Sequence, residues 1–352
     1  MNRDRQRLPI PRTRMRLATL AAGAVMLALA AAACGGSSGG SRAAGGSSSA
    51  GGSSSGGSAS VTNVKLGYVP YADDAALFLA QQDGIFRKHG LNVSFVPQAT
   101  PVAIASSMQS GQEQFGFITT PVLINLNSKG IPVKCVSSVD GAQPTNPADD
   151  GTVLVAAKNS QITSIKDLAG KNIGIVQLTS LNSLATDVLA KRAGINPASI
   201  HQITMPFPQM PAALSQGRIQ AAIIVSPFAN TAIAEGARVI DHPNAVLFPG
   251  GTVTCLDALG SYISAHPKVV EGFHAAMNEA IAYAKNHQSA AKAALTTYMN
   301  LTPQAAQKQI LSTDWNPALS AASIGQIETY MKEFGWISSA PPASSMIWPP
   351  AG

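Results

Sequence analysis

The sequence has few of the residues that most catalytic and metal sites require. Its 352 residues include three cysteines and six histidines, and only 12% of them are charged. The histidines show no metal-ligand spacing, and residues 170–172 lack the first glycine and the hydroxyl residue of a phosphate-binding loop. Residues 36–40 match the GxSxG pattern, but the surrounding glycine-serine segment cannot supply the strand and helix that expose a nucleophilic serine. The sequence therefore favours a protein that is not an enzyme and that needs no cofactor or metal.

The sequence after residues 1–16 also lacks an excess of basic residues. The formal net charge is +6, but six of the 24 basic residues lie within residues 1–16, together with one acid. From Cys34 onward, 18 basic residues stand against 17 acidic ones. This balance gives no support to a nucleic-acid partner.

The start of the chain predicts export. The basic residues 1–16 precede 17 uncharged residues rich in alanine and leucine, and small residues surround Cys34. This order is typical of a signal peptide, here residues 1–33. It resembles the signals of bacterial lipoproteins, in which the cysteine after the cleavage site is acylated, although Ala31 replaces the usual Leu, Val or Ile. The resemblance implies lipidation of Cys34.

The residues after Cys34 predict a flexible linker. Residues 35–60 contain ten glycines and eleven serines among 26, which cannot bury enough apolar surface to fold. We interpret residues 34–60 as a lipid-anchored linker. The folded part is then expected outside the cytoplasm, anchored to the outer face of the cell membrane.

The remaining residues, 61–352, predict alternating strands and helices. Strands are expected at 61–69, 91–96, 114–118, 133–137, 153–157, 172–176, 201–205 and 221–225. Helices are expected at 73–79, 102–110, from 120, and at 180–193, 228–235, 267–287, 303–312 and 320–334, with an extended run at 252–264. The alternation indicates an α/β fold with mainly parallel sheets flanked by helices.

The length of this region exceeds what one hydrophobic core usually holds and predicts two lobes. A loop rich in Gly, Pro, Asn and Asp at 140–151 indicates a boundary. We expect lobe 1 to comprise residues 61–150 and 253–352, and lobe 2 residues 151–252. Cys135 and Cys255 are free to pair in an oxidising compartment, but the sequence leaves open whether they come within bridging distance.

Polar residues recur where expected strands end and helices begin. They are residues 71–74, Thr119 and Thr120, residues 177–180, and Ser226. Ligands collect outside the carboxyl ends of strands in open α/β sheets, and helix N-termini offer unpaired N–H groups. Helix capping explains each junction alone, but four such junctions in a two-lobed chain predict a ligand cleft.

Several segments, taken in order, resemble one family. They are LGYVPYADDAALFLAQQDGIFRKHGLNVSFV (66–96), GQEQFGFITTP (111–121), SIKDLAGKNIGIV (164–176), AGINPASI (193–200) and GRIQAAIIVSPF (217–228). The chain resembles the solute-binding proteins of ABC importers, in the SsuA/THI5-like or NMT1-like group that serves nitrate, aliphatic sulfonates, taurine and the thiamine pyrimidine precursor. The resemblance implies a type II periplasmic-binding-protein fold, whose two hinged lobes close on a small-molecule ligand. It also implies a monomer that delivers this ligand to an ABC permease and its ATPase.

The resemblance and the strand-helix junctions together give a set of candidate ligand-binding residues. They are Tyr68, Tyr71, Asp73, Asp74, Thr119, Thr120, Gln177, Thr179, Ser180 and Ser226. Ser226 stands where many relatives carry an acidic or aromatic residue.

The sequence leaves the ligand open. Asp73 and Asp74 are explained by the start of a helix, where acidic residues are common. If one of them faces the cleft instead, it favours a ligand with an amine or amidine-like donor. No arginine lies in the candidate loops to hold nitrate, yet helix N-termini at Thr120 and Ser180 suit a sulfonate or carboxylate. Two other functions also stay open: a surface ligand sensor, and an enzyme that resembles the pyrimidine synthases but lacks their cysteine-rich motif.

Overall fold

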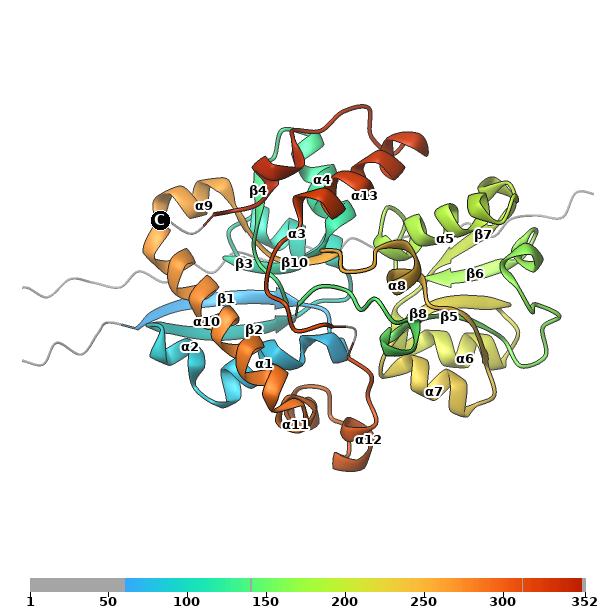
Figure 1. The fold of residues 1–352 in the computed structure, drawn as a ribbon, viewed down its shortest axis with the longest axis horizontal. Helices are drawn as coiled ribbons and strands as arrows, with labels where there is room; N and C mark the ends of the chain where they lie inside the picture. The colour runs from blue at the N-terminus through green and yellow to red at the C-terminus, as the bar shows by residue number, and fades with distance from the viewer. Residues whose placement is uncertain (1–60, 140, 312, 350–352) are drawn as a thin grey trace, which may run out of the picture. The chain divides into compact units, whose positions relative to one another are not determined.

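Two five-stranded sheets organise the part of the chain that the computed structural model describes, residues 61–139, 141–311 and 313–349 (Figure 1). Sheet A has the order β2-β1-β3-β10-β4, and sheet B has the order β7-β6-β8-β5-β9. The strands of sheet A are β1 (Thr62–Tyr68), β2 (Leu91–Pro97), β3 (Phe115–Thr119), β4 (Val133–Ser137) and β10 (Thr254–Leu259). Those of sheet B are β5 (Thr152–Ala156), β6 (Asn172–Ile175), β7 (His201–Thr204), β8 (Ala221–Val225) and β9 (Arg238–Asp241). The predictions for residues 1–60, namely the signal peptide, the linker and lipidation of Cys34, lie outside the described residues.

Each sheet is mainly parallel, with one strand running in the opposite direction. In sheet A, β1 is parallel to β2 and β3, whereas β10 is antiparallel to β3 and β4. In sheet B, β6 is parallel to β7 and β8, whereas β5 is antiparallel to β8 and β9. The reversed strand β5 is the first strand after the chain leaves sheet A for sheet B, and β10 is the first strand after it returns to sheet A. Alternation of strands and helices does not predict them, because no crossover helix of the same sheet leads into either.

Helices flank both sheets. With sheet A go α1 (Ala75–Gln82), α2 (Ile85–Lys88), α3 (Pro101–Gln109), α4 (Thr120–Ser128), α9 (Gly260–Ala265), α10 (Pro267–Asn286), α11 (Gln288–Tyr298), α12 (Pro303–Gln307) and α13 (Ala321–Glu333). With sheet B go α5 (Leu181–Arg192), α6 (Met210–Ser215), α7 (Phe228–Ala234) and α8 (Pro243–Leu247). We refer to each sheet with its helices as the A half and the B half. None of the helices in the described ranges combines the length and apolar character needed to cross a membrane.

Hydroxyl side chains start two of the helices that border the site. The Oγ1 of Thr100 accepts a hydrogen bond from the N–H of Ala103 at 3.2 Å, which caps α3. The Oγ of Ser180 accepts one from the N–H of Ser183 at 3.2 Å, which caps α5. Both caps fix where the chain turns from the end of a strand into a helix.

Several stretches differ from the expected secondary structure, among them the short helices α6 and α8, which were not expected. The extended run expected over 252–264 ends at Leu259, where α9 begins. The helix expected over 303–312 ends at Gln307. Helix α11 and the edge strand β9 were not expected from the sequence pattern.

Stacked aromatic rings join the C-terminal helices to the N-terminal strands in the core of the A half. The ring centroids of Phe115 on β3 and Phe273 on α10 lie 3.9 Å apart. Phe86 on α2 stacks on Phe273 at 5.7 Å, and all three side chains are buried. Aromatic pairs of this kind add to the stabilisation that burial of apolar area already gives. The segment after sheet B therefore packs on the same core as the first strands.

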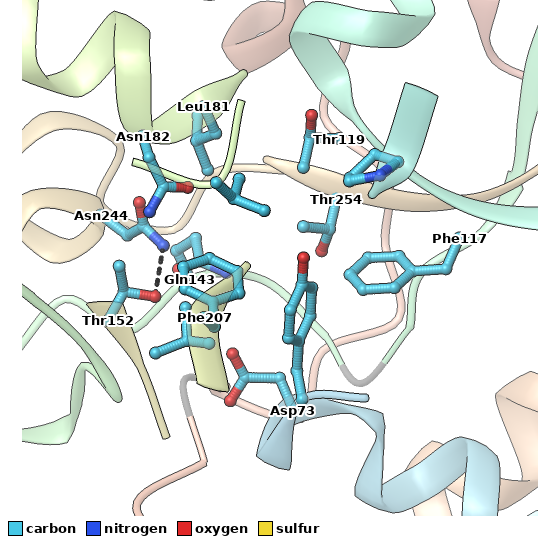
Figure 2. A pocket seen from close by; sticks show the side chains of 14 residues that line it. Asp73, Phe117, Thr119, Gln143, Thr152, Leu181, Asn182, Phe207, Asn244 and Thr254 are labelled. Carbon is cyan, nitrogen blue, oxygen red and sulfur yellow. Dashed lines mark hydrogen bonds between the residues drawn. The ribbon is translucent and has the colours of Figure 1, made fainter. Parts of the chain in front are cut away.

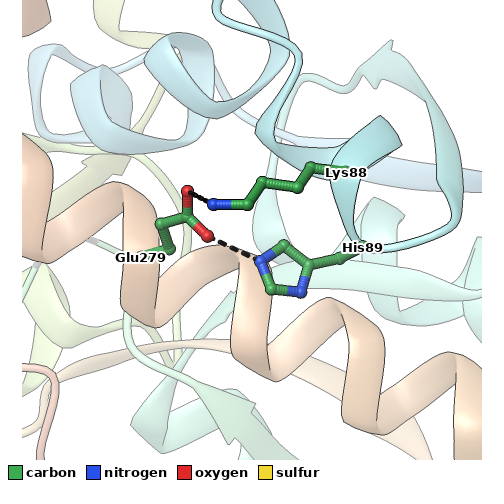
Figure 3. A network of polar contacts seen from close by, with 3 residues as sticks. All are labelled: Lys88, His89 and Glu279. Atoms are coloured by element: carbon green, nitrogen blue, oxygen red, sulfur yellow. Dashed lines mark hydrogen bonds and ion pairs between the residues drawn. The ribbon is translucent and has the colours of Figure 1, made fainter.

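A polar network also ties α2 to α10 (Figure 3). The Lys88 ammonium lies 2.7 Å from one oxygen of Glu279, and the Nε2 of His89 lies 2.8 Å from the other. The hydrogen bonds from Lys88 and His89 lower the pKa of the Glu279 carboxyl, which therefore stays ionised. The whole network lies within the A half.

Two chain segments connect the halves and run beside each other. The first leads from β4 to β5 and the second from β9 to β10. Gln143 in the first exchanges backbone hydrogen bonds of 3.0 Å with Gly250 and Gly251 in the second. A disulfide joins Cys135 on β4 to Cys255 on β10, with the Cα atoms 5.3 Å apart. The bond links the two strands of sheet A that these segments join, because the first segment leaves β4 and the second enters β10.

Candidate functional site

A cavity lies between the two halves and takes side chains from both (Figure 2). Thr119 and Thr254 are paired on β3 and β10, Val225 ends β8, and Val176 follows β6. Parallel strands of both sheets thus end at the cavity, which is where α/β folds bind ligands. Its fourteen lining residues are Tyr71, Asp73, Pro101, Phe117, Thr119, Gln143, Thr152, Val176, Leu181, Asn182, Phe207, Val225, Asn244 and Thr254.

The cavity is narrow because the halves touch at its edge. The space open to the centre of a water molecule is small, about 40 Å³. The N–H of Ala72 donates to the carbonyl of Ser226 at 3.0 Å, which joins the halves through the backbone. The N–H of Val102 donates to the Oε1 of Gln177 at 3.3 Å. These two contacts hold the walls of the cavity together at its edge.

The loop after β1 supplies the wall from the A half. It forms the 3-10 turn η1 (Ala72–Asp74), where the Oδ2 of Asp74 accepts a hydrogen bond from the N–H of Tyr71 at 3.1 Å. Burial raises the pKa of the Asp74 carboxyl well above its ordinary value, although that hydrogen bond acts in the opposite direction. Asp74 therefore holds the loop together from inside, and Asp73 is left to line the cavity.

The start of α5 and the second connecting segment supply the wall from the B half. The Nδ2 of Asn182 donates to the carbonyl of Ile223 on β8 at 3.1 Å. The Nδ2 of Asn244 lies 3.1 Å from the Oγ1 of Thr152, a contact drawn in Figure 2. The buried carboxylate of Asp150 accepts the N–H groups of Asn244 and Ala245, both at 3.0 Å. This carboxylate orders the segment that presents Asn244.

Aromatic rings from both halves line the cavity as well. The ring of Tyr71 lies edge-on to Phe117 of β3, with centroids 5.3 Å apart, and edge-on to Phe207 at 5.5 Å. Phe207 starts the turn η5 (Phe207–Gln209) in the B half. Burial raises the pKa of the Tyr71 hydroxyl well above its ordinary value, and the charges of Asp74 and Asp73 raise it further. Tyr71 therefore stays neutral and can donate a hydrogen bond.

The cavity includes three of the ten candidate ligand-binding residues: Tyr71, Asp73 and Thr119. The Oγ1 of Thr119 is buried and has no hydrogen-bond partner within the described ranges. It is thus available to a ligand.

The other seven candidates lie outside the lining, and contacts of the fold explain their positions. Tyr68 is buried against Phe78 and Phe95. The Asp74 carboxylate accepts the N–H of Tyr71, and the Thr120 hydroxyl donates to the carbonyl of Thr252. The Ser180 hydroxyl accepts the N–H of Ser183. Gln177 and Ser226 make the two contacts between the halves at the edge of the cavity. The Thr179 hydroxyl donates to the carbonyl of Leu178 at 2.6 Å.

None of the ten candidates lines the B-half wall, so sequence reasoning missed the lining residues of that half. Asn182 lies two residues after Ser180, the expected start of a helix. Its place as a polar residue in the first turn of that helix could have indicated that it lines the cavity. Gln143 and Asn244 belong to the connecting segments, and Phe207 belongs to a loop. No local pattern distinguishes such residues from ordinary loop residues.

The described residues hold no free cluster of three His, Cys, Asp or Glu side chains. Within them, one group of three potential ligands comes together, Cys135, Cys255 and Asp257. Its two sulfur atoms are already bonded to each other. This leaves a single carboxylate, which is too few donors for a metal site.

The chain is similar to proteins of solute import. It is 27% identical over 255 residues to the bicarbonate transport ATP-binding protein CmpC of Synechocystis, an alignment that spans 68% of this chain but only 38% of that protein. The ligand-binding component of an ABC-type import system from Staphylococcus aureus, solved with zinc bound, superposes with a TM-score of 0.70 at 18% identity, covering 82% of this chain and 97% of the other.

A second solved structure gives the same fold. The alkanesulfonate-binding protein SsuA from Xanthomonas axonopodis pv. citri, bound to MOPS, superposes with a TM-score of 0.69 at 16% identity, covering 82% of this chain and 99% of the other. These likenesses establish a periplasmic-binding-protein fold. The model of the NMT1/THI5-like family matches residues 72–291, which is more than half of the chain. This protein belongs to the NMT1/THI5-like family.

Proposed function

We propose that this protein is the extracytoplasmic solute-binding component of an ABC importer. It captures a small polar molecule of the sulfonate or taurine, nitrate or aminopyrimidine type and delivers it to a permease and its ATPase. The observation that carries the proposal is the cavity lined from both halves at the ends of their strands. The lobes would be residues 61–150 with 253–352, and residues 151–252, and the protein would act as a monomer.

Hinge closure follows from the two connecting segments. They are the covalent links between the halves, and they are bonded to each other through Gln143 and Gly251. A solute that bridges both walls binds the closed form only and therefore shifts the equilibrium toward it. The narrow cavity described above corresponds to that closed form.

A thermal-shift screen of the purified protein tests the proposal. Sulfonates, amino-sulfonates, nitrate, pyrimidines and small aromatic acids are the ligand classes to include. A ligand present at a hundredfold excess over its Kd raises the free energy of unfolding by about 2.7 kcal/mol. We expect at least one class to raise the melting temperature by several degrees. If none does, the proposed capture function is wrong.

Two alternatives predict different results. An enzyme on this fold would convert a ligand that stabilises it, so mass spectrometry of the incubated ligand would show a product. A surface sensor would bind its ligand but would not support uptake. Loss of radiolabelled solute uptake in cells that lack this protein, with recovery when the gene is restored, supports import over sensing.

A further inference from the structure

A buried carboxyl lies beside the disulfide in the core of the A half. One carboxylate oxygen of Asp257 and the sulfur atoms of Cys135 and Cys255 all lie within 4.8 Å of one another. The three side chains are fully buried, at 0% exposure. Cys135 comes from β4 and the other two residues come from β10, its neighbour in sheet A (Figure 1). The disulfide and the carboxyl thus form one buried cluster.

The carboxyl of Asp257 has no hydrogen bond of ordinary geometry to any described residue. Both of its oxygens, Oδ1 and Oδ2, are enclosed and lack such a partner. Burial raises the pKa of this carboxyl well above its ordinary value, and the backbone N–H of Ile118 acts in the opposite direction. A buried acceptor without a donor lowers the stability of the fold. Asp257 is therefore unfavourable in the oxidised protein.

Two other buried aspartates differ from Asp257 because each one orders a turn of the backbone. The Asp74 carboxylate accepts the N–H of Tyr71 at 3.1 Å. The Asp150 carboxylate accepts the N–H of Asn244 at 3.0 Å. Asp257 lies within β10 and orders no such turn. Support of the backbone thus does not explain a carboxyl at this position.

The donors that Asp257 lacks appear when the disulfide is reduced. A sulfur atom in a disulfide carries no hydrogen and cannot donate a hydrogen bond. In the reduced protein, Cys135 and Cys255 each carry an S–H group, which is a weak donor. Both sulfur atoms already lie within the 4.8 Å cluster, so rotation of the cysteine side chains can direct the S–H groups at the carboxyl oxygens. The oxygens therefore gain partners in the reduced form.

We infer that the bond between Cys135 and Cys255 is a reversible redox site that exchanges with a dithiol, and that Asp257 shifts its equilibrium toward the reduced form. One thiol of the dithiol gives up its proton and attacks one sulfur of the bond, and the other sulfur leaves with the electron pair and takes up a proton. The second thiol then gives up its proton and attacks the mixed disulfide, and the remaining cysteine leaves and is protonated. The dithiol is oxidised to a cyclic disulfide, and two cysteine thiols form.

The surroundings of the bond control how fast this exchange occurs. The N–H of Trp348 donates to the carbonyl of Cys135 at 2.9 Å, and Ile347 forms a parallel bridge with the same residue. Because both sulfur atoms are buried, a reductant reaches them only through local opening of the A half. Exchange should therefore be slow, and Asp257 acts on its equilibrium.

A redox titration of the full protein without denaturant tests the inference. The protein is brought to equilibrium from both the oxidised and the reduced side in mixtures of reduced and oxidised dithiothreitol. Alkylation and mass spectrometry of the peptides that contain Cys135 and Cys255 give the reduced fraction. Asp257→Ala should need a roughly 5- to 20-fold higher ratio of reduced to oxidised dithiothreitol for half reduction, because it removes the acceptors of both S–H groups. Asp257→Asn keeps one acceptor oxygen and should lie between the two.

Asp187→Asn is the matched control. It removes another carboxyl whose pKa burial raises, but in the B half, and it should leave the ratio for half reduction unchanged. Circular dichroism at the same ratios shows whether each protein stays folded. If Asp257→Ala does not fold, Asp257→Asn supplies the comparison.

Two outcomes would overturn the inference. If the Asp257 variants are reduced as easily as the wild type, or if Asp187→Asn shifts the ratio by the same factor, Asp257 does not act on the bond. If the wild type is reduced only when it unfolds, the bond is not a reversible site of the folded protein. The capture function does not depend on either outcome, because the cluster shares no residue with the cavity lining.

Discussion

Cys135 and Cys255 are bonded across neighbouring strands at the two points where the chain leaves sheet A for sheet B and returns from it. The bond closes a loop with a sequence separation of 120 residues, which contains all of sheet B. It holds β4 and β10 together at the base of the connecting segments. In the A half, the two connecting segments are therefore attached to strands that a disulfide joins.

Reduction of this bond should lower stability substantially. The loop-entropy relation gives about 5 kcal/mol for a loop of this length, because the reduced unfolded chain gains freedom. Urea unfolding of the oxidised and the reduced protein measures the difference. Cys135→Ala/Cys255→Ala serves as the control, since its midpoint should not respond to reductant. Equal midpoints for oxidised and fully reduced wild-type protein would contradict this role.

The close approach of α3 to sheet A depends on glycines in paired positions. Gly67 on β1 and Gly116 on β3 are neighbours across the sheet. A Cβ on Gly116 would meet the Sδ of Met108, and it would come within 2.5 Å of Ile104. Gly116→Ala should therefore lower the free energy of unfolding by roughly 1–3 kcal/mol through overpacking.

Gly325 provides the matched control for this substitution. It lies inside α13, where an added Cβ would have Ala343 at 3.8 Å as its nearest neighbour. Gly325→Ala should raise the free energy of unfolding by about 0.5–1 kcal/mol, because alanine favours the helix. Denaturant unfolding of both variants checks the pair, and destabilisation of equal size in both would contradict the packing explanation.

The strands that alternate with helices were predictable because each is a short run, alternating as in β2 or continuously apolar as in β5 and β8, that stands between loop or helix signals. β9 was not, because it is a polar edge strand: Arg238 donates to the carbonyls of Lys158, Ser160 and Ile162, contacts that no local pattern reveals. The same limit applies to the site. Tyr71 and Asp73 follow directly from the end of β1, whereas Asn244 takes its position from Asp150, which lies 94 residues earlier in the chain.

Asp187 should make stability depend on pH. Burial raises the pKa of its carboxyl to about 6, although the 2.8 Å hydrogen bond from Gln202 acts in the opposite direction. The folded protein then holds this proton more tightly than the unfolded chain, so the contribution of Asp187 to stability is lost as pH rises from about 4 to about 6. Above that range Asp187→Asn should be more stable than the wild type by about 1 kcal/mol, after allowance for its partial exposure.

Urea unfolding of both proteins at several pH values between 3.5 and 7.5, roughly the window set by the two pKa values, checks this sign. The comparison of variant with wild type cancels the contributions of other carboxyls. A difference that is constant across the range, or that grows as pH falls, would show that Asp187 does not titrate in this way.

Cys34 should decide whether the protein stays at the membrane. The sequence predicts its acylation after cleavage of residues 1–33, with residues 35–60 as the linker. Cys34→Ala should move the protein from the membrane fraction to the soluble fraction or the medium. Fractionation with immunoblotting measures the change, and Ser41→Ala, in the same linker, is the control. Unchanged membrane association of Cys34→Ala would remove the anchor from the proposed function.

A contact between α5 and α13 should tune ligand affinity from outside the cavity. Lys191 on α5 forms an ion pair with Glu333 on α13, and the Nη2 of Arg192 donates to the hydroxyl of Tyr330 at 3.0 Å. Both contacts join the B half to the A half without touching the cavity lining. They are present in the conformation whose cavity is narrow, so their loss should favour separation of the halves.

Glu333→Gln should therefore weaken binding of any ligand found in the screen by about two- to fivefold, because an exposed ion pair contributes up to about 1 kcal/mol. High salt should weaken wild-type binding by a similar factor and leave the variant unaffected. Glu279→Gln breaks the ion pair with Lys88 within the A half and should leave affinity unchanged (Figure 3). If both variants change affinity equally, the effect is general charge loss. If Glu333→Gln binds more tightly, the contact instead stabilises the open form.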